Sequence, residues 1–581
     1  MRTTPDPASD LHELFRDEWE AHLRDDPLFA TITGDTRYND RLPEASESRH
    51  ARRAEDLRRF LARLERIAPD ALTPGDRLNA DIFRRLKQAE LREIEFGVYR
   101  MPLDRMGGYD TFFAELPGFL RFTAVKDYED YLARLAAFPA YNEGQMGLMR
   151  DGIRLGMTQP RPALDGVLDG IERLASTDAK ESVFFGPFEN IPEALAGSTA
   201  DRLRAEARRL IEGAVVPAYR ALGRFMEETY LPGARTTTAA ADLPDGARFY
   251  EHRVEMFVSR PVSPQEVHET GLTEVRRILQ EMEAVRRKVG FRGDHAAFGE
   301  FLRTEPRFYA PSAEQLLKEV AYILKRMDGE LPRLFRRLPR LPYGIKPVPD
   351  YVAPQTTTAY YWEGAGDGSR AGFYYVNTYD LRSRPLYELE ALSLHEAVPG
   401  HHLQIALQQE LKDLPEFRRF EGFTAFVEGW ALYAERLGLE AGFYTDPYSD
   451  YGRLIYEMWR ACRLVVDTGL HAFGWSRAQA IDFLLQNSAL TERNVRNEID
   501  RYLTVPGQAL AYKMGELKIR QLRRRAEQHL GERFDLRAFH DALLGDGAVP
   551  LDVLEAKLGA WIEEQGRASP AAGAPPSQPS S

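Results

Sequence analysis

The chain has 581 residues, a length that exceeds one ordinary hydrophobic core and predicts two or more domains or lobes. Its 77 basic and 89 acidic side chains give a net charge of -12, which argues against a nucleic-acid partner because such a partner favours a basic surface. The only cysteine, Cys462, excludes a disulfide within the chain and fits a reducing compartment.

The first ten residues, 1–10, carry no basic start followed by an apolar stretch, so they do not resemble a secretory signal. No run of about 18 apolar residues occurs in the sequence, and we therefore expect no membrane span. These features predict a cytoplasmic protein.

Long helical patterns dominate the sequence, for example over residues 56–66, 200–228 and 264–289. The last of these begins with a capping pattern in which Ser263 precedes a proline and Glu266 follows three residues later. The fold class expected from these patterns is mainly α.

Prolines and glycines interrupt the helical pattern over residues 231–246, where we expect the boundary between two lobes. The predicted organisation is an N-terminal helical lobe over residues 1–240 and a catalytic lobe over residues 241–565. Residues 566–581 are rich in alanine, serine and proline, a composition that predicts a disordered tail.

Two segments rich in β-formers, residues 357–362 and 373–378, flank a glycine-rich connection at residues 364–368. This pattern predicts a β-hairpin. An exposed edge of that hairpin could pair with an extended peptide through main-chain hydrogen bonds. The alternative is that the aromatic side chains only form core.

The segment from His395 to His402 places a glutamate, Glu396, and three histidines within eight residues. Imidazoles are good zinc ligands, and a glutamate beside the first ligand is placed to take a proton from a metal-bound water. The leucines before His395 recur at helical spacing, so the motif is expected in a helix that begins after Pro385. The alternative is an ordinary amphipathic helix in which histidines cluster.

The spacing of the histidines leaves two candidates for the second metal ligand. A regular helix brings His402, seven residues after His395, back to the same face, whereas His401 lies about 120° away. Pro399 collides with the carbonyl of His395, so a kink or bulge there, eased by Gly400, would move His401 into the ligand position. We favour His401 and keep His402 as the alternative.

Glu428 is the candidate third ligand because it lies within an almost entirely apolar helical segment, residues 423–435. A carboxylate in such surroundings is costly unless it is paired or bound to a metal. Glu421 and Glu435 lie seven residues to either side on nearly the same face, and one of them is expected to support the site. The alternative is that these glutamates are solvated.

Arg463, Asp467 and His471 fall on one helical stripe at i, i+4 and i+8. Arg463 could bind a substrate carboxylate, and Asp467 could orient a ligand histidine or His471. The alternative is a salt-bridged surface stripe.

Tyr512 is the candidate donor to the oxyanion that develops during hydrolysis, and Gln508 lies one turn earlier on the same face. The alternative is a packed tyrosine with a satisfied hydroxyl.

Four segments, HEAVPGHHLQ, FVEGWALYAE, RLVVDTGLHAFGW and VPGQALAYKMG, resemble the bacterial family known as domain of unknown function 885. More distantly, the sequence Phe426-Val427-Glu428 after Gly400-His401 is similar to gluzincin peptidases typified by thimet oligopeptidase and carboxypeptidase Taq. That similarity implies two histidines and a downstream glutamate around zinc. It supports His401 as the second ligand, although two more residues separate the two histidines here than in those peptidases.

The sequence as a whole predicts a mainly α, two-lobed, metallopeptidase-like fold with a small β hairpin or sheet beside the active-site cleft. The expected activity is zinc-dependent hydrolysis of short or unfolded peptides, with Glu396 as the base and Tyr512 as the oxyanion donor. Another divalent metal, such as cobalt or manganese, would also suit the ligands. The alternatives are a metal-dependent amidase of a non-peptide substrate and a non-catalytic helical peptide-binding protein.

Overall fold

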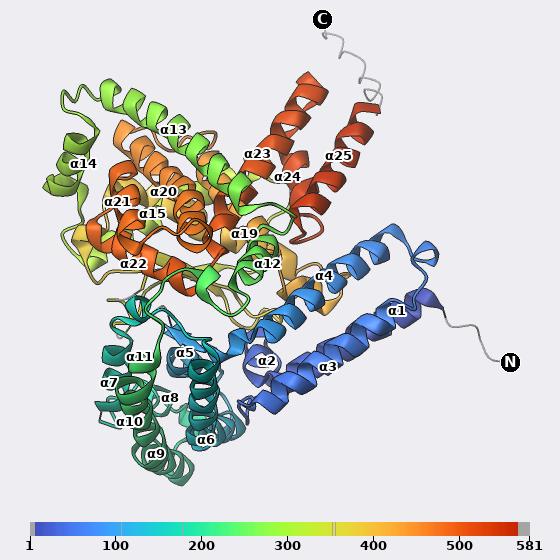
Figure 1. The fold of residues 1–581 in the computed structure, drawn as a ribbon, viewed down its shortest axis with the longest axis vertical. Coiled ribbons are helices and arrows are strands. Elements are labelled where there is room, and N and C mark those ends of the chain that lie inside the picture. The colour runs from blue at the N-terminus through green and yellow to red at the C-terminus, as the bar shows by residue number, and fades with distance from the viewer. Residues whose placement is uncertain (1–5, 106, 177, 351, 355, 568–581) are drawn as a thin grey trace, which may run out of the picture.

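The computed structural model describes residues 6–567 except 106, 177, 351 and 355 (Figure 1). The fold is mainly α-helical with two small sheets, as the sequence predicts. Within the described residues, none of the helices combines the length and apolar character that a membrane span requires. The tail predicted from residue 566 begins inside the last helix, and residues 568–581 lie outside the described residues.

The first half of the chain consists of helices and one short two-stranded sheet. Its helices are α1 (Pro7–Asp25), α2 (Pro27–Thr33), α3 (Glu47–Leu64), α4 (Pro74–Phe96), α5 (Tyr109–Glu115), α6 (Val125–Leu155), α7 (Val167–Ser176), α8 (Gly186–Glu189), α9 (Ser198–Leu210), α10 (Val216–Phe225), α11 (Leu231–Gly233), α12 (Gly246–Val258) and α13 (Pro264–Lys288). Strands β1 (Leu103–Asp104) and β2 (Gly107–Gly108) pair antiparallel. Helix α13 begins as expected, with Ser263 accepting a hydrogen bond from the backbone N–H of Glu266.

The second half contains a three-stranded sheet followed by the helices of the candidate site. The strands are β3 (Tyr343–Pro347), β4 (Ala359–Trp362) and β5 (Gly372–Val376). The helices are α14 (His295–Thr304), α15 (Ala313–Leu334), α16 (Leu389–Glu396), α17 (His401–Gln409), α18 (Glu416–Phe420), α19 (Thr424–Leu437), α20 (Pro447–Ala472), α21 (Arg477–Asn487), α22 (Glu492–Thr504), α23 (Ala511–Leu530), α24 (Leu536–Leu544) and α25 (Leu551–Arg567).

Two separate apolar cores organise the chain. The smaller core draws its buried side chains from residues 103–234, which form the bundle of α5 to α11 at the lower left of Figure 1. The larger core combines side chains from residues 240–562 with those from residues 11–83 and with Met157 and Ala163. The smaller core ends at Ala234, the larger core continues from Ala240, and α1 to α4 bury side chains in the larger core.

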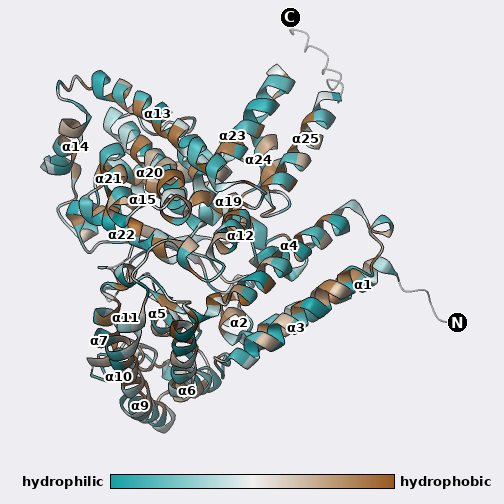
Figure 2. Cartoon of the chain, viewed as in Figure 1, coloured by the Kyte–Doolittle hydropathy of each residue, from teal (hydrophilic) through white to brown (hydrophobic). Residues whose placement is uncertain are grey.

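The long helices are amphipathic and mix hydrophilic and hydrophobic positions in Figure 2. Helix α3 illustrates the pattern, because it buries Leu57, Phe60 and Leu64 while most of its other positions are charged. Burial of such faces is the main driving force for packing these helices into the two cores.

The predicted hairpin is present as β4 and β5, which pair antiparallel with Tyr360 opposite Tyr375. Strand β3 adds to the other side of β5 in a parallel arrangement, so the strand order is β3-β5-β4. Strand β4 is consequently an edge strand of this sheet, and its backbone edge is not covered by another strand of the sheet.

A close helix crossing brings the segment of Glu428 against the segment of Tyr512. Helices α19 and α23 approach at Gly429 and Gly515, where a Cβ on Gly429 would lie 2.5 Å from the backbone of Gly515. A Cβ on Gly515 would lie 1.9 Å from the carbonyl oxygen of Ala425. The two glycines therefore allow a backbone contact that a larger side chain would prevent.

Lys513, which follows Tyr512, is buried and not a surface residue. Its ammonium group lies 2.8 Å from Glu457, 2.9 Å from Glu516 and 3.1 Å from Glu274. This buried ion cluster links α13, α20 and α23 behind the site, where three carboxylates compensate the lysine charge.

Candidate metal centre

The motif segment contains a helix break in place of the kinked continuous helix expected from the sequence. Helix α16 ends at Glu396 and α17 begins at His401, with residues 397–400 in an irregular turn between them. Gly400 is required there because a Cβ on it would lie 1.9 Å from the carbonyl oxygen of His395. The break places His401 at the start of a new helix, with its ring 4.8 Å from that of His395.

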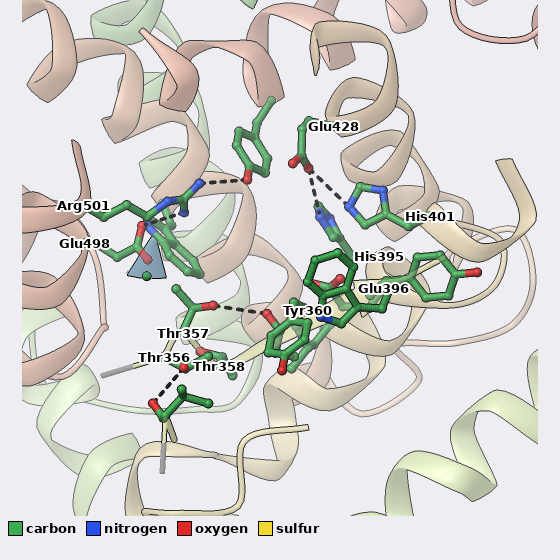
Figure 3. Close-up of a pocket in the computed structure, with 18 of the residues that line it drawn as sticks. Thr356, Thr357, Thr358, Tyr360, His395, Glu396, His401, Glu428, Glu498 and Arg501 are labelled. Carbon is green, nitrogen blue, oxygen red and sulfur yellow. Dashed lines mark hydrogen bonds and ion pairs between the residues drawn. The ribbon is translucent and has the colours of Figure 1, made fainter. Parts of the chain in front are cut away.

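His395, His401 and Glu428 converge on one point, as Figure 3 shows. The Nε2 atom of His395 lies 3.5 Å from Glu428 Oε2, and the Nε2 atom of His401 lies 3.3 Å from the same oxygen. The two imidazole planes are nearly perpendicular, at 88°. The structure therefore brings together the three residues that the sequence analysis favours as ligands.

The separations of these ligand atoms fit a divalent ion. Zinc ligands on a tetrahedron with bonds of about 2.1 Å stand about 3.4 Å apart, close to the 3.3 and 3.5 Å found here. Direct hydrogen bonds to a carboxylate are shorter, about 2.7–2.9 Å. In addition, Glu428 Oε2 is buried and lacks a hydrogen-bond partner among the described residues. The donor set therefore suits zinc.

Glu435, one of the two predicted supporting glutamates, fixes the orientation of His395. Its Oε1 lies 2.8 Å from His395 Nδ1, which leaves Nε2 directed toward Glu428. Burial lowers the pKa of His395, but the neighbouring carboxylates of Glu428 and Glu435 outweigh burial and raise the pKa to about 9.

Glu421, the other predicted supporting glutamate, belongs to a different cluster with Glu18 and His22. The ammonium group of Lys87 already lies between these carboxylates, at 3.0 Å from Glu421 and 3.2 Å from Glu18. A lysine therefore occupies the position of a cation in this second group.

His402 lies outside the converging group. Its Nδ1 is 2.9 Å from the hydroxyl of Tyr361 on β4, and its ring packs against Tyr343 on β3. Burial lowers the pKa of His402 to about 4. The side chain therefore joins α17 to the sheet, and the geometry favours His401 over His402 as the ligand.

Glu396 and the three converging residues line a cavity of about 630 Å³. The cavity lies between the two cores, since α5 contributes Glu115 to it while β4 contributes residues 359–362. Burial raises the pKa of Glu115 to about 7. Glu396 is 8% exposed, so its carboxylate is largely shielded from bulk water.

Tyr512 also lines the cavity, and its ring stacks 6.2 Å from that of His395. Its hydroxyl oxygen accepts hydrogen bonds from Arg501 Nη2 at 3.2 Å and Gln508 Nε2 at 3.4 Å. Gln508 Oε1 in turn accepts from Arg501 at 2.6 Å. Gln508 thus contacts the predicted oxyanion donor.

Arg463 lines the cavity but is already held by protein groups. Its Nε donates to the Tyr502 hydroxyl at 2.8 Å, and its Nη2 lies 2.9 Å from Glu498 Oε2. Its guanidinium also covers the Tyr512 ring at 4.3 Å. Sequence reasoning missed Arg501 and Glu498, because each is one charged residue among many in α22 and neither is marked by a motif.

Asp467 and His471 lie on the expected stripe but make other contacts than those predicted. Asp467 accepts hydrogen bonds from the Tyr250 hydroxyl at 2.7 Å and from the N–H of Gly507. Burial raises the pKa of Asp467 to about 7. His471 Nδ1 accepts a hydrogen bond from the backbone N–H of Ala240, and its Nε2 is hydrogen-bonded to the carbonyl oxygen of Tyr502. Within the described residues neither contacts a candidate ligand, so both serve to hold the segments around the site together.

Comparison with known proteins gives relatives without an assigned activity. A family model described as "Bacterial protein of unknown function (DUF885)" matches residues 27–558. A solved "putative lipoprotein" from Colwellia psychrerythraea has a TM-score of 0.91 and 28% identity over 97% of this chain and 100% of that one. Another, of unknown function and from Shewanella oneidensis, has a TM-score of 0.70 and 17% identity over 94% and 99%. None of the curated proteins matches.

Proposed function

Since this chain belongs to the DUF885 family of bacterial proteins, whose function is unknown, we propose an activity from the site alone: zinc-dependent hydrolysis of peptide bonds in short or unfolded peptides. The observation that carries the proposal is the convergence of His395, His401 and Glu428 beside Glu396 in a large cavity. Three such ligands, a neighbouring carboxylate and room for a substrate are the elements of metal-assisted hydrolysis.

In this proposal His395, His401 and Glu428 hold the metal, and Glu435 keeps His395 in the orientation that presents Nε2. Zinc, when bound, would supply Lewis acidity toward water and the substrate carbonyl. The ligand set also accepts other divalent ions.

Glu396 is the proposed general base. It follows the ligand His395 directly and lines the same cavity, so its carboxylate reaches the water that attacks the substrate carbonyl. It takes the proton of that water and passes it to the leaving amine.

Tyr512 is the proposed donor to the oxyanion. Arg501 and Gln508 both donate to the phenol oxygen, so the hydroxyl hydrogen of Tyr512 remains available for the substrate. A donor directed at the oxygen where charge develops lowers the barrier by about 3–4 kcal/mol.

The edge strand β4 is the proposed guide for the substrate backbone. Residues 359–362 line the cavity, and an extended peptide could add to this edge through main-chain hydrogen bonds that do not depend on sequence. We therefore propose a two-lobed, gluzincin-like fold in which β4 lies beside the active-site cleft.

We propose the cytoplasm as the location, which agrees with Cys462 as the only cysteine. The lipoprotein names of the two solved relatives belong to those proteins and favour a different compartment. Fractionation of cells followed by detection of this chain distinguishes the cytoplasm from the other compartment.

The test replaces Glu396 with Gln and measures peptide hydrolysis together with bound zinc. The proposal expects the loss of turnover by at least about 100-fold with about one zinc per chain retained. Glu440→Gln, at an exposed position in the turn that follows α19, is the control and keeps full activity. A wild-type protein that binds zinc but cleaves only non-peptide amides would support the amidase alternative, and one that binds no zinc would contradict the proposal.

A further inference from the structure

Three arginines gather on the wall of the cavity beside Tyr512. Arg460 and Arg463 come from α20 and Arg501 from α22, and all three line the cavity. Arg501 contacts the Tyr512 hydroxyl directly, and the guanidinium of Arg463 lies over the Tyr512 ring. The group is therefore continuous with the proposed catalytic residues.

The carboxylates on this wall do not balance the arginines. Arg463 and Arg501 share Glu498, at 2.9 and 3.5 Å from its Oε2. Arg460 lies 3.7 Å from Glu435, which is also hydrogen-bonded to His395. Two guanidinium groups thus share one carboxylate, which leaves an excess positive charge in a shielded place where water and salt compensate it poorly.

The arginines also retain unused hydrogen-bond donors. Nη1 of Arg463 is buried and has no hydrogen-bond partner among the described residues, and the same holds for Nε of Arg460. Arg501 is more accessible, with 16% of its side chain exposed. Buried donors without acceptors are costly, so a site of this kind gains free energy when an anionic acceptor arrives.

Resting on the proposed peptidase function, we propose that Arg501, backed by Arg463, binds a carboxylate of the substrate, so that the protein removes residues from the C-terminal end of peptides. Figure 3 shows Arg501 and Glu498 across the cavity from Glu428 and His401. Arginine suits this role because its planar group binds both oxygens of a carboxylate.

The position of Arg501 limits how far the carboxylate lies from the bond that is cut. Its Nη2 is 3.2 Å from the Tyr512 hydroxyl, which in the proposed mechanism contacts the reacting carbonyl. One extended residue spans about 3.5 Å. A carboxylate on Arg501 is therefore one or two residues after the scissile bond, which corresponds to release of a single amino acid or a dipeptide.

The first experiment compares matched peptides with the wild-type, zinc-loaded protein. One peptide ends in a free carboxylate, the second in an amide, and the third is amidated but carries Asp or Glu near its end. We expect kcat/KM to be about 10- to 100-fold higher for the free acid than for the simple amide. If the third peptide is cleaved as well as the free acid, the site binds an acidic side chain and the proposal of C-terminal cleavage is overturned. Equal kcat/KM for all three would overturn the proposal.

The second experiment measures the same ratio in variants. Arg501→Gln should reduce the acid-to-amide ratio to near one, and Arg501→Lys should keep part of it, because the charge remains but the two-point contact is lost. Arg496→Gln, an exposed residue on the same helix, is the matched control and keeps the ratio. Any general effect of Arg501 on Tyr512 changes the cleavage of both peptides alike, so it cancels in the acid-to-amide ratio. An unchanged ratio in Arg501→Gln would contradict the assignment.

Failure of this inference is distinguishable from failure of the proposed function. If Glu396→Gln abolishes cleavage but acid and amide peptides react equally, the peptidase proposal stands and the carboxylate site is wrong. If no peptide is cleaved, binding of an N-acetylated amino acid and of its amide to the zinc-loaded protein still tests the site. Tighter binding of the acid, weakened at least tenfold by Arg501→Gln, would support it, and equal binding would overturn it.

Discussion

The indole N–H of Trp430 donates a hydrogen bond of 2.9 Å to the carbonyl oxygen of Pro399. Trp430 lies two residues after Glu428, and Pro399 lies in the turn between His395 and His401. This single contact therefore joins the helix of Glu428 to the turn that separates His395 from His401.

Trp430→Phe should remove this bond while it keeps most of the apolar packing of a fully buried side chain. Because the carbonyl oxygen of Pro399 is then left without its partner, we expect a loss of about 1–3 kcal/mol in the free energy of unfolding, together with weaker zinc binding. Unfolding with and without zinc measures both quantities. Trp561→Phe, at a partly buried position on α25, is the control. Unchanged zinc affinity in Trp430→Phe would show that the contact does not position the ligands.

Glu435→Gln tests whether the orientation of His395 matters for the metal. The amide can still contact Nδ1 but supplies no negative charge, so we expect zinc affinity to fall by about 10- to 100-fold. Competition with a chelator measures the affinity. Glu440→Gln, five residues later and partly exposed, should bind zinc as the wild type does. Equal affinity in the two variants would mean that Glu435 only compensates buried charge.

The buried side chain of His540 is expected to make the free energy of unfolding depend on pH in the acid range. It is fully buried, with Nδ1 bonded to the carbonyl oxygen of Leu334 and Nε2 to the hydroxyl of Tyr433. Burial lowers its pKa from 6.5 to about 3, so the folded state keeps the neutral form. Below pH 6.5 the unfolded state binds the proton and the folded state does not, and stability therefore falls as the pH is lowered toward 3.

His540→Gln should flatten this dependence, because glutamine offers a donor and an acceptor but does not titrate in this range. Between pH 6.5 and 5 the wild type should lose about 2 kcal/mol more than the variant. Urea unfolding at the two pH values measures the difference. His529→Gln, at an exposed position near the end of α23, should follow the wild type. The same loss in His540→Gln and wild type would contradict the assignment.

The sequence predicted the helical fold, the β4–β5 hairpin and the convergence of the motif histidines with Glu428. These features depend on local patterns: helical periodicity, β-formers around glycines, and a carboxylate in an apolar helix. The prediction that the helix is interrupted near Pro399 is confirmed. The sequence did not show that α16 ends before it, because the close approach of Gly400 to the carbonyl of His395 depends on how α17 crosses α16.

The rest of the site depends on contacts between distant segments. Arg501 meets Tyr512 only because α22 and the start of α23 pack beside α20, and nothing in the local sequence separates it from other arginines of α22. Asp467 was placed on the right stripe, but its partners, Tyr250 and Gly507, come from segments that spacing on one helix does not reveal. Burial of Lys513 likewise follows from three carboxylates on other turns and helices.

The most direct test of the account is anomalous diffraction at the zinc absorption edge from crystals grown with zinc. The account predicts one strong peak within about 2.0–2.2 Å of Nε2 of His395, Nε2 of His401 and an oxygen of Glu428. The absence of a peak between these three side chains, or a peak bound by His402 in place of His401, would contradict it.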